Sequence, residues 1–568
     1  VDTVYETDVF TPLVRRVEEV SGKSYRESRE SSYAISVLAE HGRSAAFLIA
    51  DGVVPGNEGR GYVLRRVIRR AIRHGRRLGM EDVFLGEIAA LTIENMGHIY
   101  PELRNHKDFI QTVISLEEKK FQQAFQNGYA LLSEALAEGN SLPGKEAFRL
   151  WDTYGFPLEI TQEIALESGV DVDVEGFERE MNAQRERARA SASFEGDRAK
   201  ILLYESLGIG ETKFLGYEQV AFSSIVVGLI SKSQVVGEAH VGDDVELVLL
   251  ETPFYPEGGG QIGDAGEISG RDSRVDISDT QTMMPGLIVH FGKVVAGKVA
   301  LGDTVDTHVD RVRRQDTARN HTATHMLHAA LRQVLGPHVR QAGSLVAPDR
   351  LRFDFSHVEP VSEREKEEVQ LLVNERIRQD VDVHSSEDSY VSAIQRGALA
   401  FFGDKYEDTV RLIDIANGES FSFEVCGGTH VNRTGEIGAV YILGESSIGA
   451  GMRRIEAVSG RAAERLVSER LAMNSAVAEL LRVPLADIQE RLQSLLDESD
   501  NLKRENEALQ RKLSLQSAES LLEEKRNVCG VPVLATRVAV LKAESLREIG
   551  DWLRGKMGTG IVVLGSVI

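Results

Sequence analysis

The chain has 568 residues, 42% hydrophobic and 27% charged, a composition typical of a soluble protein with several domain cores. Its formal net charge of −22 excludes nucleic-acid binding through overall charge, so any such binding needs a local basic surface. Two cysteines far apart exclude a disulfide framework and predict a cytoplasmic location, and no apolar run approaches the length of a membrane span.

Residues 1–205 are predicted to be helical, and the predicted helix at residues 62–78 is the most informative. One face carries an apolar stripe at helical spacing, formed by Leu64, Val67, Ile68, Ala71 and Ile72. Arginines occupy the remaining faces, among them Arg65, Arg66, Arg69, Arg70 and Arg73, and no acidic residue lies between positions 60 and 77. A solvated helix usually mixes charge signs. The all-positive face therefore favours a track for RNA phosphates over a merely solvated surface.

Residues 206–309 change to a strand pattern. Segments rich in β-branched residues and bounded by glycines lie at 220–230, 245–250 and 287–291, which predicts a small β-barrel or sandwich. The string TPFYPEGGGQIGDAG at 252–266 lies within it. It lacks the Lys-Ser/Thr ending of a nucleotide phosphate loop. The three glycines therefore indicate either a tight turn or a close approach of the backbone to a ligand or another chain.

A candidate metal site is formed by two short motifs about a hundred residues apart. His321 and His325 are four apart on a predicted helix, so their imidazoles lie on one face. Cys426 and His430 flank a Gly-Gly-Thr turn. Each pair alone is often structural, but three nitrogens and one sulfur suit tetrahedral zinc. The sequence predicts a Zn²⁺ site at these four residues, and no residue is predicted to bind an organic cofactor.

Beyond residue 460 the composition shifts to Leu, Glu, Arg and Gln. Alternating three–four spacing defines a heptad seam of Leu485, Ile488, Leu492, Leu495, Leu502, Leu509 and Leu513. The seam either pairs two chains as a homodimer or folds back against residues 461–481. Short strands and a helix are predicted from residue 531 to the end at 568.

Several strings in combination resemble the alanyl-tRNA synthetase family. They are NHTATHML at 320–327, CGGTHV at 426–431, GSL at 343–345 followed by LRFDFSH at 351–357, GNEGRGYVLRR at 56–66, DTYGFP at 152–157 and the glycine-rich string at 252–266. The resemblance covers essentially the whole chain.

This resemblance implies tRNA(Ala) as the partner and assigns roles to individual residues. In the family an Asn and an Asp, here Asn57 and Asp152, read the G·U wobble pair of the acceptor stem. The exposed amino group of that guanine suits a carboxylate acceptor and an amide. Gln341 matches a position that governs the editing pocket.

The motifs and the resemblance together predict a multidomain α+β chain. The predicted parts are a helical tRNA-recognition domain (1–205), a β-barrel with the Gly-rich motif (206–309), an α/β zinc editing domain (310–460), a helical coiled-coil linker (461–526) and the start of a C-terminal RNA-binding or oligomerisation domain (527–568). No Arg-x-Glu ATP clamp or Gly-rich third class II motif is found. We therefore expect a fragment lacking the N-terminal class II aminoacylation domain, with ATP and Mg²⁺ confined to that absent domain and no ligase activity in this chain.

The expected reaction is hydrolysis of serine or glycine esters on tRNA(Ala), because an alanine pocket rejects such small differences by only ~10–200-fold. Four protein ligands fill a tetrahedral zinc, so two mechanisms stay open. Either one ligand is loose and a zinc-bound water with a pKa of about 7 attacks, or zinc only orients the ribose or substrate amine. Gln341 and Thr324 are the candidate catalytic residues that place the water, although a helix-surface hydroxyl explains Thr324 equally well. The alternative is a non-catalytic, zinc-stabilised tRNA-binding module.

Overall fold

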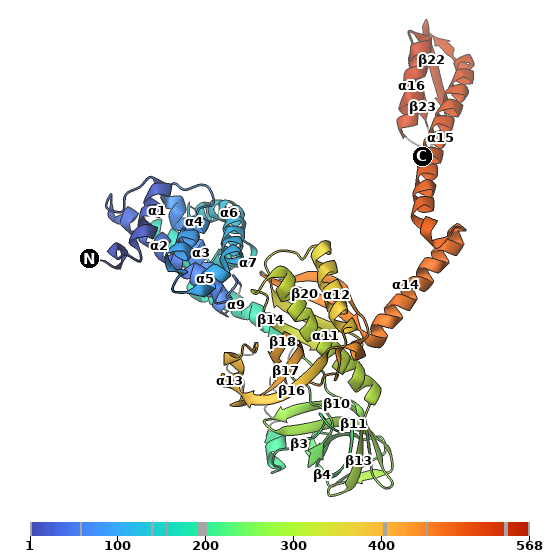
Figure 1. Cartoon of the computed structure of the whole chain (residues 1–568). Helices are drawn as coiled ribbons and strands as arrows, with labels where there is room; N and C mark the ends of the chain where they lie inside the picture. The colour runs from blue at the N-terminus through green and yellow to red at the C-terminus, as the bar shows by residue number, and fades with distance from the viewer. Residues whose placement is uncertain are drawn as a thin grey trace. The chain divides into compact units, whose positions relative to one another are not determined.

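The computed structural model describes residues 3–56, 59–137, 141–154, 156–189, 202–401, 406–449, 451–538 and 543–565. The chain divides into two compact units, Val1–Glu464 and Arg465–Ile568, whose elements are shown in Figure 1. It is a multidomain α+β protein, as predicted, and none of its described helices is long and apolar enough to cross a bilayer. The finer domain boundaries stay predictions.

The N-terminal part of the first unit is helical. Its α-helices are α1 (Thr11–Ser21), α2 (Arg29–Ala50), α3 (Gly59–Arg77), α4 (Leu85–Met96), α5 (Pro101–Asn105), α6 (Lys107–Ala137), α7 (Gly144–Tyr154), α8 (Leu158–Glu167) and α9 (Val174–Arg189), with a short 3-10 helix at Val4–Glu6 and two-residue strands β1 (Ser141–Leu142) and β2 (Asp171–Val172). The predicted apolar stripe of α3 is confirmed, because Leu64, Ile68 and Ala71 are fully buried in the shared core. Burial of this stripe against α2 and α6 holds α3 in place.

A closed antiparallel barrel follows, which settles the predicted choice between barrel and sandwich. The strands of this region are β3 (Lys213–Phe214), β4 (Ala221–Ser231), β5 (Gln234–Val235), β6 (Glu238–His240), β7 (Asp244–Leu249), β8 (Glu251–Thr252), β9 (Gly266–Ser269), β10 (Arg274–Met284), β11 (Leu287–Ala296), β12 (Lys298–Ala300) and β13 (Thr304–Val309). Six of them run in the order β13-β9-β10-β11-β7-β4, and β4 pairs with β13 to close the ring.

The barrel encloses a histidine, His290 of β11, that is fully buried. Its Nδ1 donates to the Leu247 carbonyl at 2.9 Å, and its Nε2 accepts from the Thr252 hydroxyl at 2.7 Å. This pattern requires a neutral ring, and burial lowers the pKa of His290 to about 4.

We expect the barrel to lose stability in mild acid through His290. The pKa of His290 is lower in the folded state than in the unfolded chain (about 6.5). The contribution of neutral His290 to the free energy of unfolding is therefore complete above pH 6.5 and is lost as the pH falls toward 4. The loss between pH 7 and pH 5 is roughly 2 kcal/mol. His290→Gln keeps a donor and an acceptor but cannot titrate, so its pH dependence should be smaller by that amount. Urea titrations followed by hydrogen exchange of barrel peptides at both pH values measure it, and identical dependences for the two proteins would contradict it.

Residues 311–459 form the module that contains the two metal-ligand motifs. Its elements are α11 (Arg311–Leu335), β14 (Gln341–Val346), β15 (Leu351–Ser356), α12 (Glu363–Arg378), β16 (Asp382–Ser389), α13 (Tyr390–Gln395), β17 (Thr409–Asn417), β18 (Glu419–Val425), a 3-10 turn (Thr434–Ile437), β19 (Val440–Gly449) and β20 (Met452–Ser459). They make a sheet in the order β14-β15-β20-β19 and another in the order β16-β17-β18. Helix α11 contacts strands of both sheets, as Figure 1 shows.

The second unit is built on long helices and a small sheet. Helix α14 (Gly460–Leu481) leads into it, and α15 (Ile488–Leu521) is followed by β21 (Arg526–Val528), β22 (Val531–Arg537), α16 (Ala543–Met557) and β23 (Ile561–Gly565). The heptad residues Leu492, Leu502, Leu509 and Leu513 are 44–63% exposed. The single chain therefore shows no coiled coil at these leucines, and pairing of two chains stays a prediction.

Candidate metal centre

Helix α11 supplies the paired imidazoles. The Asp310 side chain caps its first turn by accepting from the backbone N–H groups of Val312 and Arg313, both at 3.0 Å. One turn of helix separates His321 from His325, and their rings stack with centroids 5.2 Å apart. Both are buried, so the helix presents them to the interior of the module.

The turn after β18 supplies the thiol and the third imidazole. Arg411 donates to the carbonyl oxygens of Cys426 (3.2 Å) and Gly428 (2.7 Å), and the Tyr217 hydroxyl donates to the Gly427 carbonyl at 2.5 Å. A Cβ on Gly428 would lie 2.0 Å from Cε1 of His321. Glycine at this position therefore lets the turn close directly onto α11.

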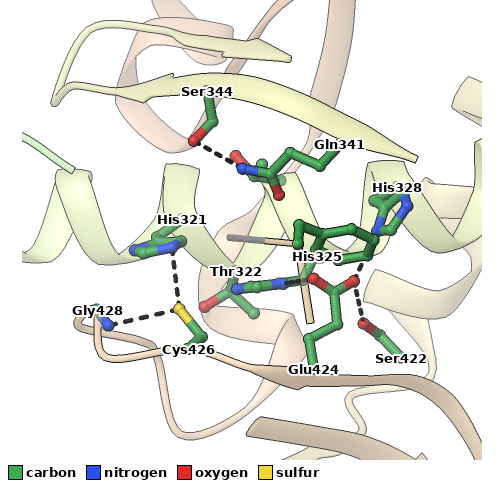
Figure 2. Close-up of polar contacts among 12 residues, drawn as sticks. His321, Thr322, His325, His328, Gln341, Ser344, Ser422, Glu424, Cys426 and Gly428 are labelled. Atoms are coloured by element: carbon green, nitrogen blue, oxygen red, sulfur yellow. Dashed lines mark hydrogen bonds and ion pairs between the residues drawn. The ribbon is translucent and has the colours of Figure 1, made fainter. Parts of the chain in front are cut away.

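The four predicted ligands come together. The Cys426 Sγ lies 3.3 Å from His321 Nε2 and 3.4 Å from His430 Nε2, and one candidate ligand atom from each of the four residues lies within 4.8 Å of the others. Figure 2 shows Cys426 facing His321 across this space. Sulfur and nitrogen ligands of one tetrahedral zinc lie about 3.6 Å apart, given bonds of about 2.3 and 2.05 Å. The spacing between the motifs thus fits a single ion.

Hydrogen bonds fix which nitrogen of each ring faces the centre. The Glu424 carboxylate accepts from His325 Nδ1 at 2.7 Å. Thr322 commits its hydroxyl hydrogen to the Ala318 carbonyl, so its oxygen accepts from His430 Nδ1 at 3.2 Å. Both rings therefore carry their hydrogen on Nδ1 and present the Nε2 lone pair inward, the arrangement typical of metal-ligating histidines.

The charges at the cluster favour a thiolate among imidazoles. Burial alone would raise the pKa of Cys426, but His321, His325 and His430 outweigh it and hold that pKa well below the usual value. Burial lowers the pKa of His430 to about 3, with His321 acting in the same direction.

An unpaired nitrogen atom supports zinc binding independently of the distances between the ligands. The Nε2 atom of His325 is buried and has no hydrogen-bond partner in the described structure. A buried, unpaired nitrogen is costly unless something coordinates it. With two further Nε2 atoms and a thiolate directed at the same point, a cation suited to N₃S ligation would satisfy it.

The two predicted catalytic residues have different surroundings. Gln341 lies on β14, across from the imidazoles in Figure 2, and its Nε2 donates to Ser344 Oγ at 3.1 Å. Thr324 is buried, and its hydroxyl donates to the Asn320 carbonyl one turn earlier, at 2.8 Å. That bond accounts for the Thr324 hydroxyl structurally. The roles of both residues stay predictions.

The predicted arginine track faces a row of carboxylates. Glu159, Glu163 and Glu167 repeat every four residues on α8, and their ion-pair partners on α3 are Arg66 (2.8 Å), Arg70 (3.1 Å), Arg73 and Arg77 (2.7 Å). Arg65 and Arg69 are buried and pair with Glu117 of α6. The absence of acidic residues within α3 is thus offset by glutamates distant in sequence, and the tRNA role of these arginines stays a prediction.

The two predicted wobble-pair readers lie in the helical region. Asp152 is exposed near the end of α7, where a nucleic acid can reach it. Asn57 lies outside the described residues. Their joint role stays a prediction.

The partners of the metal ligands are the residues that the sequence analysis missed. Glu424 lies on β18, two residues before Cys426, which directly follows the strand. His328 stands one turn beyond His325 and donates from Nδ1 to the same Glu424 carboxylate at 2.8 Å. Gln261, of the glycine-rich string, accepts from His321 Nδ1 at 2.7 Å. Periodicity would have revealed Glu424 and His328, whereas only tertiary contacts reveal Gln261.

Two models of known protein families match the chain. The family model described as tRNA synthetases class II (A) matches residues 1–313, and that described as threonyl and alanyl tRNA synthetase second additional domain matches residues 410–456. The chain belongs to the class II (A) tRNA synthetases.

Its similarity to particular members confirms the resemblance to alanyl-tRNA synthetases. The chain is 44% identical to alanine–tRNA ligases from Roseiflexus sp. (strain RS-1) and Chloroflexus aurantiacus, and 42% identical to that from Geobacillus thermodenitrificans. Each alignment covers all of this chain and 65% of the relative. The chain therefore spans just under two thirds of the length of these ligases.

The class II match corrects one prediction. The expectation that the chain lacks a class II domain, and with it the conclusion that ligase activity is not expected, is contradicted by the match at residues 1–313. The expectation rested on the absence of short ATP-binding strings. The family model matches residues 1–313, which form the helical region and the barrel. Neither region contains the short ATP-binding strings. The restriction of ATP and Mg²⁺ to an absent domain is withdrawn for the same reason.

Proposed function

We propose that the chain functions in alanine–tRNA ligation and removes serine or glycine wrongly attached to tRNA(Ala). The convergence of His321, His325, Cys426 and His430 on one point carries the editing part of this proposal. The match to the second additional domain at 410–456 supports it, because that segment contains Cys426 and His430. The class II match and the alanine–tRNA ligase relatives support charging, with ATP and Mg²⁺, as the other part.

The role that we propose for each residue of the site follows from its hydrogen bonds. Zinc held by the four ligands would supply a Lewis acid near the scissile ester. Glu424 and Thr322 keep the Nε2 atoms of His325 and His430 directed inward. Gln341 lies across from His325 (Figure 2) and offers an amide to orient the terminal ribose or a water.

A polar cavity beside the cluster agrees with a small polar substrate. It encloses about 580 Å³ and reaches Thr429 and the ligand His430. Its walls include Glu387, Ser386 and Arg411. Such a lining suits an amino acid ester better than an apolar ligand.

For RNA recognition we propose that Asp152, Asn57 and the more exposed arginines of α3, Arg66 and Arg70, contact the acceptor stem of tRNA(Ala). Exposure of Asp152 on α7 supports this. A cytoplasmic location and a homodimer formed through the exposed leucines of α15 belong to the same proposal.

The decisive experiment incubates the whole chain with seryl-tRNA(Ala) and follows the release of free serine, with alanyl-tRNA(Ala) as the control substrate. We expect selective release of serine. Tight binding of both tRNAs without hydrolysis would instead establish a zinc-stabilised binding module. Charging is tested separately, by formation of alanyl-tRNA from alanine, ATP, Mg²⁺ and tRNA(Ala).

A further inference from the structure

The glycine-rich loop of the barrel reaches into the metal centre. It connects β8 with β9 and runs beside β14, where Val346 N donates to the Gly260 carbonyl at 2.7 Å and Ile262 N donates to the Val346 carbonyl at 3.1 Å. Gly260 has a φ of +87°, and a Cβ there would lie 2.1 Å from Ser344 Oγ. Only glycine permits this approach, which places the next residue, Gln261, at α11.

Gln261 is fully buried, and every hydrogen bond of its side chain goes to the metal centre or its turn. Its Oε1 accepts from His321 Nδ1 at 2.7 Å and from the Thr429 backbone N–H at 2.9 Å. Its Nε2 donates to Thr429 Oγ1 at 2.9 Å. The side chain therefore joins three segments: the barrel loop, helix α11 and the Cys426–His430 turn.

These contacts determine the tautomer of His321. A backbone N–H can only donate, so the bond from Thr429 N identifies the amide oxygen of Gln261 unambiguously. That oxygen can only accept, so His321 Nδ1 must carry the hydrogen. The Nε2 atom of His321 then holds a lone pair, directed at Cys426 Sγ 3.3 Å away.

We propose that Gln261 is a positioning residue for the metal ligand His321, so that the barrel supplies a necessary part of the editing centre. The inference rests on the proposed function of that centre. The Nδ1 partners of His325 and His430, which are Glu424 and Thr322, come from the same module as the ligands. Among the described contacts, His321 alone takes its Nδ1 partner from the barrel. The metal centre is complete only when barrel and module are docked.

Removing the Gln261 oxygen that accepts from His321 should therefore weaken metal binding, although none of the four metal ligands is changed. Outer partners of metal-bound histidines typically contribute 10–100-fold to affinity. We expect Gln261→Leu, which keeps the volume but has no acceptor, to weaken zinc binding by about that factor. Gln261→Asn keeps the amide but shortens the side chain by one methylene, so the amide oxygen no longer reaches His321. This variant should also bind zinc more weakly. Gln261→Glu retains the acceptor for Nδ1 and should restore most of the affinity.

The test measures zinc dissociation constants of the whole chain by chelator competition, together with the visible spectrum of the Co²⁺-loaded chain. Gln281→Leu is the matched control, because Gln281 lies on β10 of the same barrel and its side chain donates to Asp279 instead of to a metal ligand. The inference predicts weaker zinc binding and an altered Co²⁺ spectrum in the Leu and Asn variants, with recovery in the Glu variant. Unchanged affinity in both the Leu and Asn variants would overturn this inference and leave the proposed function intact. Failure of the unaltered chain to bind zinc would overturn both.

Discussion

Replacing Cys426 by alanine is expected to remove the metal and to lower the hydrolysis of seryl-tRNA(Ala) by at least about a hundredfold, since loss of an outer partner alone costs up to that factor. The thiolate lies within 3.4 Å of two Nε2 atoms and is the anionic member of the ligand set. Without it, the site keeps three neutral imidazoles and no anionic ligand. Zinc analysis of the purified variant and a deacylation time course measure the two effects.

The other cysteine provides the control for this experiment. Cys529 is exposed and lies in the second unit, so Cys529→Ala should keep both zinc and activity. Equal zinc content and hydrolysis in the Cys426 and Cys529 variants would contradict the assignment. Metal binding and folding are coupled in such sites, so retention of tRNA binding by the Cys426 variant must be verified in parallel.

Replacing Asp264 by alanine is expected to destabilise the first unit by about 3–5 kcal/mol, the usual cost of leaving one member of a buried ion pair alone. Asp264 of the barrel and Arg314 of α11 are both buried and form a bidentate pair, with Arg314 Nε 2.8 and 3.0 Å from the two carboxylate oxygens. Arg314 also donates to the carbonyls of Gly216 and Pro253, both at 2.7 Å. The pair therefore fastens the metal-binding helix to the barrel.

Urea unfolding of the Asp264→Ala variant, followed by hydrogen exchange of barrel and α11 peptides, measures the loss. Glu238→Ala breaks the exposed pair with Lys298 and should leave the midpoint unchanged, because exposed pairs contribute little. The double variant Asp264→Leu with Arg314→Met removes both charges and should be less damaged than Asp264→Ala. If the urea midpoint of Asp264→Ala equals that of Glu238→Ala, the ion pair of Asp264 and Arg314 does not hold α11 on the barrel.

The sequence predicted those features that depend on local spacing. Two histidines four residues apart and a Cys-x₃-His turn supply three nitrogens and one sulfur, which predicted an N₃S metal site. The strand pattern at 220–291 predicted a barrel or sandwich. The stripe of Leu64, Ile68 and Ala71 predicted the buried face of α3. Each of these signals comes from the spacing of residues within a single helix, strand or turn, so it can be read without tertiary contacts.

Features that depend on partners distant in sequence were not predictable in the same way. The arginines of α3 looked like a bare cationic face because their glutamates lie about ninety residues later, on α8. The glycine-rich string predicted a tight turn or a close approach, but not the role of Gln261, because its partners, His321 and Thr429, lie on other elements. The class II assignment was missed because the search relied on short ATP-binding motifs, whereas the family match at 1–313 extends over helices and strands without them.

Deacylation of seryl-tRNA(Ala) before and after metal removal tests the central claim most directly. The whole chain is stripped with a chelator, verified to be metal-free, assayed, and assayed again after one equivalent of Zn²⁺ is restored. The ligation of one ion by His321, His325, Cys426 and His430 predicts that hydrolysis disappears on stripping and returns with zinc. Full hydrolysis by the metal-free chain would contradict it.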